Sequence, residues 1–169
     1  MKSLLKSEHW SKCSRLLLFI VALLIAVLLW TLSIKQAMPE LNSEKLKSAK
    51  ALWTEMGPKR YTMEVEISGV QHGHHHIVVE HGVVVSMTTD GYDVPKSAWE
   101  YWNVEGMFRF LAEELIQASH PGGGFGAPDP EKIYLSANFD ATLGYPREYL
   151  RQVFGANVTI HWLVTLHHN

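Results

Sequence analysis

The chain has 169 residues, a formal net charge of −2 and one cysteine, Cys13. A lone cysteine excludes an internal disulfide, so the fold must be held by its apolar core. The charges are unevenly placed, because residues 1–35 hold five Lys or Arg and one Glu, whereas residues 36–169 hold ten basic and sixteen acidic side chains. An acidic C-terminal part argues against nucleic acid as a partner.

Residues 16–34 read LLLFIVALLIAVLLWTLSI, without a charge, a glycine or a proline. As a helix they would extend roughly 28 Å, close to the ~30 Å hydrocarbon thickness of a bilayer. The sequence therefore predicts a transmembrane helix that contacts the lipid bilayer. A cleaved signal peptide is the alternative, although its apolar region would be shorter and would end at a small-x-small site.

The basic residues before this run predict the orientation of the chain by the positive-inside rule. The prediction is a single-pass protein of a bacterial inner membrane, with a cytoplasmic basic tail at residues 1–15 and a linker at 35–42. Residues 43–169 would then form one domain in the periplasm.

The first element of that domain is a predicted helix that begins at Ser43, the expected cap, and stops at Gly57-Pro58. Next, residues 61–68 alternate between apolar and polar side chains, which is typical of a strand with one wet face. The runs 77–80 and 83–87 are separated by His81-Gly82, which predicts a tight hairpin. A loop rich in aromatic residues follows from residue 90.

Asn103 is the expected cap of a second helix with one apolar stripe, and alternating runs at 133–139 and 158–166 predict strands after it. Residues 148–154 predict a further, outer strand, because polar side chains break the alternation there. The predicted fold class is α+β, with the N-terminal transmembrane helix followed by one small domain. That domain would be an antiparallel sheet of about five strands with a helix packed on one face, in the order α-β-β-β-α-β-β.

Four motifs occur in the same order as in a known family: ALW at 51–53, VEHGVV at 79–84, NVEGMF at 103–108 and FDATLGYP at 139–146. With them, about residues 46–166 resemble a bacterial extracytoplasmic domain-of-unknown-function family, found mostly in lipoproteins and membrane-anchored proteins. The resemblance implies an exported α+β domain without an established activity, so no catalytic residue is carried over. The chain departs from the family in having a His-rich segment where many members have a Cys-containing insert, and a protein anchor in place of a lipid.

The motif residues themselves favour structural roles. Asp140 can accept hydrogen bonds within its own turn, and Gly144 can take a positive φ. Gly106 would let the helix start approach the sheet closely. Glu105 is expected to be a first-turn charge and not an acid catalyst.

The strongest chemical signal is HGHHH at 72–76, since neutral imidazoles at this density bind Cu²⁺, Ni²⁺ or Zn²⁺. No cofactor is expected, apart from Cu or Zn held by the candidate ligands His72, His74 and His76. Two of these would share one strand face, and histidines at 161, 167 and 168 would join only if the last strand lies nearby. The alternatives are a solvated hairpin end or a pH-responsive patch.

Two hypotheses for function follow. The first is a non-enzymatic accessory subunit whose periplasmic domain caps or stabilises a larger membrane protein complex, such as a respiratory or photosynthetic one. Its candidate contacts are Tyr92, Trp99, Trp102 and Phe125, although these rings could instead fill the core. The second is a periplasmic metal- or ligand-binding sensor or carrier that uses the His-rich hairpin.

Overall fold

The computed structural model describes residues 18, 20–23, 38–120, 125, 133–156 and 158–168. Its contacts divide the chain into two units, Met1–Ala37 and Met38–Asn169, and each is described by itself. Within the described residues no helix has both the length and the apolar character needed to cross a bilayer. This finding contradicts the predicted single-pass helix and the inner-membrane location that was inferred from it. Of the predicted span at 16–34, all but residues 18 and 20–23 lie outside the described part of the chain.

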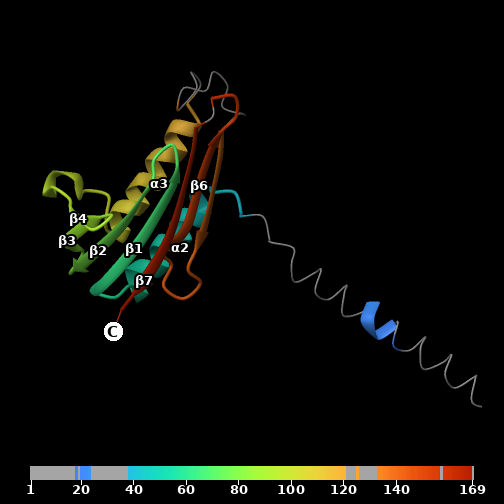
Figure 1. Cartoon of the computed structure of the whole chain (residues 1–169), viewed down its shortest axis with the longest axis horizontal. Coiled ribbons are helices and arrows are strands. Elements are labelled where there is room, and N and C mark those ends of the chain that lie inside the picture. Colours follow the sequence, from blue (N-terminus) through green and yellow to red (C-terminus); the bar gives the residue numbers. More distant parts are fainter. Residues whose placement is uncertain are drawn as a thin grey trace, which may run out of the picture. The chain divides into compact units, whose positions relative to one another are not determined.

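The second unit consists of two α-helices, one short 3-10 helix and seven strands among the residues described. In chain order the elements are α2 (Ser43–Met56), β1 (Arg60–Gly69), β2 (Gly73–Glu80), β3 (Val83–Thr89), β4 (Tyr92–Asp93), η1 (Lys96–Ala98), α3 (Val104–Ala118), β5 (Ile133–Phe139), β6 (Pro146–Val153) and β7 (Val158–His167). The strands form one sheet in the order β4-β3-β2-β1-β7-β6-β5, and each neighbouring pair is antiparallel. Figure 1 shows α2 and α3 against the same face of this sheet.

The predicted count of about five strands is wrong. Three strands follow α3, at the three runs expected, although the predicted order α-β-β-β-α-β-β counted only two of them, and Tyr92–Asp93 adds a short strand at the edge of the sheet. The strand expected at 148–154 is not an outer one, since β6 lies between β7 and β5. Tyr92–Asp93 is too short to show any periodicity.

The alternation in β1 separates the two faces of the sheet. Tyr61, Met63, Val65 and Ile67 are buried, with at most 6% of each exposed, and pack with α3 residues such as Leu111 in one apolar core. Neither helix covers the opposite face, where the exposed or half-exposed polar side chains of the strands lie. The domain therefore has one helix layer on one sheet, with an open sheet face.

Capping bonds define the starts of both helices. Asn103 caps α3 as predicted, because its side chain accepts a hydrogen bond from Gly106 N at 2.6 Å. Asn42, and not Ser43, caps α2 by accepting from Lys45 N at 2.9 Å. The prediction for Gly106 needs correction as well, since an added Cβ would lie 2.7 Å from the Tyr101 Cα and so would meet the preceding loop, not the sheet.

The turn at residues 140–146 has the predicted structural role. Asp140 Oδ1 accepts hydrogen bonds from Thr142 N at 2.9 Å and Leu143 N at 2.8 Å, and Gly144 has a φ of 83°. An added Cβ on Gly144 would lie 2.3 Å from the carbonyl oxygen of Ala49 in α2. The turn is therefore docked tightly on the first helix.

Candidate functional site

The predicted metal ligands lie at the start of β2. His72 is exposed and precedes the strand, while His74 and His76 are exposed on the open face, opposite Glu66 and Glu64 of β1. His74 Nε2 lies 2.6 Å from Glu64 Oε2. Two of the three candidates therefore share a face, as expected, and one of them is already paired with a carboxylate.

His75 points to the other face and has a structural environment. Its ring is half-buried with its centroid 4.3 Å from that of Trp102, and its Nδ1 lies 2.7 Å from Thr89 Oγ1. Burial lowers the pKa of His75, and the neighbouring His74 lowers it further, while Asp90 opposes the shift. A neutral imidazole is favoured at this position.

The sheet order brings one histidine of β7 close to the hairpin, because β7 pairs with β1 and β1 pairs with β2. Glu64, Glu66, His74 and His167 line one hollow of about 240 Å³ on the open face. Within the described residues, no group of three or more His, Cys, Asp or Glu is arranged to hold a metal ion. Binding of Cu or Zn stays a prediction.

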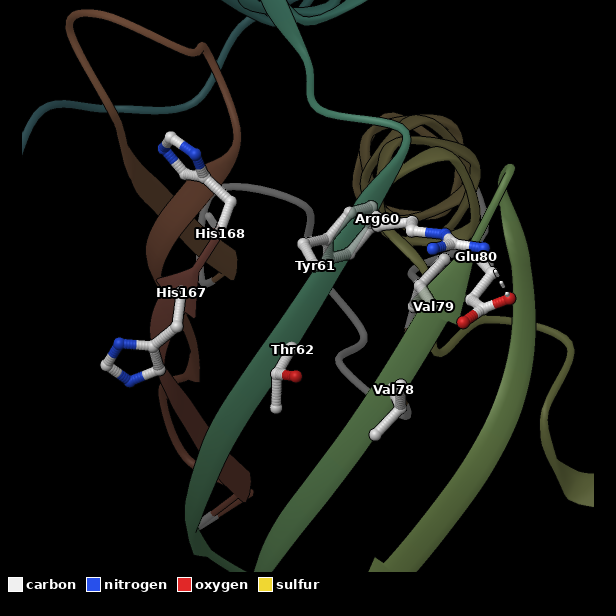
Figure 2. A pocket seen from close by; sticks show the side chains of 8 residues that line it. All are labelled: Arg60, Tyr61, Thr62, Val78, Val79, Glu80, His167 and His168. Atoms are coloured by element: carbon white, nitrogen blue, oxygen red, sulfur yellow. Dashed lines mark ion pairs between the residues drawn. The ribbon is translucent and has the colours of Figure 1, made fainter.

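A second hollow on the open face, of about 390 Å³, lies where β1 begins and where β2 and β7 end. Figure 2 shows Arg60 and Glu80 joined across neighbouring strands, with His167 and His168 on the other side of β1. The ion pair has an N–O distance of 3.7 Å, and its side chains are 70% and 43% exposed. Solvent screens a pair this exposed, so the hollow is a weakly polar surface feature.

The four predicted contact residues have different environments. Tyr92 is 79% exposed, whereas Trp99 is half-buried and donates its indole N–H to the Val94 carbonyl at 2.9 Å. Trp102 is half-buried near Trp162, with 6.0 Å between ring centroids. Phe125 is half-buried, with the Arg151 guanidinium 4.2 Å from its ring centroid. Three of the four rings thus make contacts within the domain, and only Tyr92 extends freely from the described surface.

An apolar depression between the two helices was not foreseen from the sequence. A groove of about 630 Å³, here called the α2–α3 groove, is lined by side chains of α2, α3 and the residues just before α2. The apolar lining residues are Leu41, Leu46, Phe108, Ala112, Leu115 and Ile116. Ile116 is 66% exposed and lies outside the apolar stripe that predicted α3, which is the sequence signal that could have marked this surface.

The rim of the α2–α3 groove is cationic. Lys47, Lys50 and Arg109 line it, and no Asp or Glu is among its described lining residues. These are three of the ten basic side chains within residues 36–169, which carry sixteen acidic ones. A local positive potential on an acidic domain favours an acidic ligand.

A buried charge network was also missed by sequence reasoning. Glu114 is 5% exposed, and its carboxylate accepts hydrogen bonds from the Tyr149 hydroxyl and from Arg151 Nη1, the latter at 2.7 and 2.8 Å. Burial, and then the nearby Glu114 charge, raise the pKa of Tyr149, so its hydroxyl stays protonated. Glu114 lies seven residues after Met107 and three after Leu111, which places it on the apolar face of α3. This spacing is the sequence signal that could have marked Glu114 as a buried charge.

Comparison of the chain with protein-family models, with curated proteins and with solved structures finds no match. The family resemblance of the four motifs stays a prediction. A function must therefore be argued from the residues of the domain itself.

Proposed function

We propose that this chain is a non-enzymatic accessory protein whose α+β domain binds a segment of another protein in the α2–α3 groove. The observation that carries the proposal is the combination of an apolar lining, in which Ile116 is exposed and Ala112 and Leu115 are half-buried, with a rim of one sign of charge. An acidic amphipathic helix is the ligand class that fits both features, since helix-in-groove recognition uses apolar anchors on one helix face. The partner would be a subunit of the complex that the domain stabilises.

The apolar part of the groove supplies the affinity in this proposal. Ile116 is two-thirds exposed on a helix whose other large apolar residues are mostly buried, and covering it removes apolar surface from water. Such burial is worth about 25 cal/mol per Å² before the costs of association. Apolar anchors spaced along a partner helix would occupy the groove beside Leu115 and Phe108.

The cationic rim supplies orientation and speed of binding. Lys47 and Lys50 are exposed on α2 and Arg109 is exposed on α3, so acidic side chains on both flanks of a bound helix would meet a cation. Pairs at an exposed rim add little affinity but raise the association rate in a salt-dependent way. Binding should therefore slow down as ionic strength rises.

The test uses the full-length chain and a helix-favouring synthetic peptide with Leu at i, i+4 and i+7 and Glu at the flanking positions. Fluorescence anisotropy should give saturable binding that Ile116→Glu weakens at least tenfold. The matched control is Val83→Glu, because Val83 is 63% exposed and lies on β3, away from the groove. It should leave the affinity unchanged.

A peptide with Lys in place of Glu should bind at least tenfold more weakly than the Glu peptide. The double variant Lys47→Glu/Lys50→Glu should reduce or reverse the preference for the Glu peptide. The proposal fails if the two peptides bind equally or if Ile116→Glu and Val83→Glu have the same effect. A photo-crosslinking amino acid at position 116 in the native host then identifies the natural partner. A crosslinked segment without acidic residues would contradict the charge argument.

A further inference from the structure

A second, smaller cavity lies on the helix side of the sheet, away from the α2–α3 groove. It has a volume of about 250 Å³ and is walled by four aromatic side chains, here called the aromatic pocket: Tyr101, Trp102, Phe110 and Trp162. Arg151 and Gln71 supply its polar lining. We propose that the aromatic pocket binds a small planar aromatic carboxylate.

The ring geometry favours a flat ligand. Phe110 stacks on Trp162 with 4.6 Å between centroids and 29° between planes, and Trp102 lies 6.0 Å from Trp162 at 36°. Trp162 is 7% exposed, whereas Trp102, Phe110 and Tyr101 are only half-buried. A further ring added to this cluster would bury the remaining surface of three large side chains in a stacked or edge-on arrangement.

The size of the cavity limits the ligand to a small one. Pockets for drug-sized molecules have volumes of roughly 300–1,000 Å³, so about 250 Å³ suits one or two fused rings with a short substituent.

Arg151 is the charged donor of the pocket lining. Arg151 uses Nη1 for both of its hydrogen bonds to Glu114, and its buried Nε has no hydrogen-bond partner in the part of the chain that is described. The side chain is 12% exposed and lines the pocket, so part of it remains within reach of a ligand. The buried Nε is itself out of reach, so a ligand acceptor would meet the part of the guanidinium side chain that is exposed, and such charge-assisted hydrogen bonds are the stronger ones.

The indole N–H groups of the tryptophans differ in whether they have an acceptor. Trp53 and Trp99 donate theirs to Glu105 Oε1 at 3.0 Å and to the Val94 carbonyl at 2.9 Å, respectively. For Trp102 and Trp162, which line the pocket, no acceptor is seen within the described residues, and neither indole nitrogen is among the buried unpaired atoms there. Arg151 and the two indoles offer donors to the pocket, while Gln71 offers a donor and an acceptor, and carboxylate oxygens accept from such donors more strongly than neutral groups do.

The competing ligand class is a cation, because aromatic rings also bind ammonium groups through their faces. Arg151 opposes this class, since its guanidinium lines the cavity and has Phe125 4.2 Å from its centre on one side. Glu114 cannot attract a cation into the pocket, because its carboxylate already accepts from Arg151 and Tyr149.

The experiment titrates the full-length chain with three probes of equal ring size: indole-3-carboxylate, neutral indole and cationic 3-(aminomethyl)indole. Calorimetry should give at least tenfold tighter binding for the carboxylate than for either other probe. In NMR spectra the indole N–H signals of Trp102 and Trp162 should shift during the titration, while those of Trp53 and Trp99 should not.

Two variants separate this pocket from adventitious binding. Trp102→Leu should weaken carboxylate binding at least tenfold, whereas Trp99→Leu, a half-buried tryptophan outside the pocket, should not. The double variant Glu114→Gln/Arg151→Gln, once shown to be folded by circular dichroism, should retain indole binding but lose the preference for the carboxylate. The proposal is overturned by a lack of binding of all three probes, by tighter binding of the amine, or by equal effects of the two tryptophan variants.

Discussion

Glu114→Gln tests whether the buried network of Glu114, Tyr149 and Arg151 holds α3 on the sheet. The substitution preserves volume but removes the only negative charge that Arg151 contacts within the described residues, and the side chain of Arg151 is 12% exposed. Leaving such a charge without its partner costs about 3–5 kcal/mol. Domains of this size are stable by roughly 5–15 kcal/mol in total, so a large share of the free energy of unfolding should be lost.

The measurement is urea unfolding of the full-length protein, monitored by circular dichroism. The shift in the urea midpoint is multiplied by the m-value shared by the variants, which gives the change in the free energy of unfolding. Glu113→Gln is the matched control, because Glu113 is the preceding residue of α3 but is exposed. Its carboxylate accepts from the Tyr101 hydroxyl at 3.2 and 3.4 Å. That change should cost less than about 1 kcal/mol.

A compensated variant completes the test. Glu114→Met/Tyr149→Phe/Arg151→Met removes all three polar partners together and leaves none of them unpaired, so its stability should return to within about 2 kcal/mol of the original. The reasoning is refuted if Glu114→Gln costs no more than Glu113→Gln, or if the triple variant is less stable than Glu114→Gln.

Two further predictions concern the turn and the titration of a histidine. Gly144→Ala should lower stability by more than about 2 kcal/mol, because it combines a φ of 83° with a Cβ 2.3 Å from the Ala49 carbonyl oxygen. Gly91→Ala, with a φ of 84° and open space around the added Cβ, should cost only about 1 kcal/mol, and equal losses in urea midpoints would disprove the steric argument. Burial lowers the pKa of His75 in the folded chain below the ordinary value of about 6.5 that applies in the unfolded chain. As the pH falls below about 6.5, the unfolded chain therefore binds a proton at this site more readily than the folded chain. The contribution of His75 to the free energy of unfolding is complete above that pH and is lost as the pH falls below it. His75→Gln should therefore flatten the decline in the urea midpoint between about pH 7 and pH 5. An unchanged decline would show that His75 does not cause it.

The features that sequence predicted well are those decided within a few residues. The hairpin at His81-Gly82 forms with Glu80 opposite Val83, and the cap at Asn103 and the hydrogen bonds of Asp140 lie where expected. In each case the responsible group and its partner are at most four positions apart, so residue type and spacing are sufficient information.

The predictions that failed depended on partners distant in the sequence or on a pattern that was too weak. Arg151 breaks the alternation of β6 because it meets Glu114 from α3, and that contact could not be inferred from alternation alone. The expected membrane span was inferred only from the length and apolar character of residues 16–34. No helix among the described residues is long and apolar enough to cross a bilayer.

The candidate sites came almost entirely from the tertiary structure. The apolar and polar faces of each strand follow from alternation, and the stripe of α3 follows from helical spacing, so sequence determined which side chains face the core. The same alternation is compatible with many strand orders. Only folding placed β7 between β1 and β6, which brings His167 to the hollow lined by Glu64 and Glu66, and set α2 beside α3 to form a groove. The physical reason is that burial rewards any arrangement that covers apolar faces, and the choice among such arrangements depends on how particular side chains fit together across long stretches of chain.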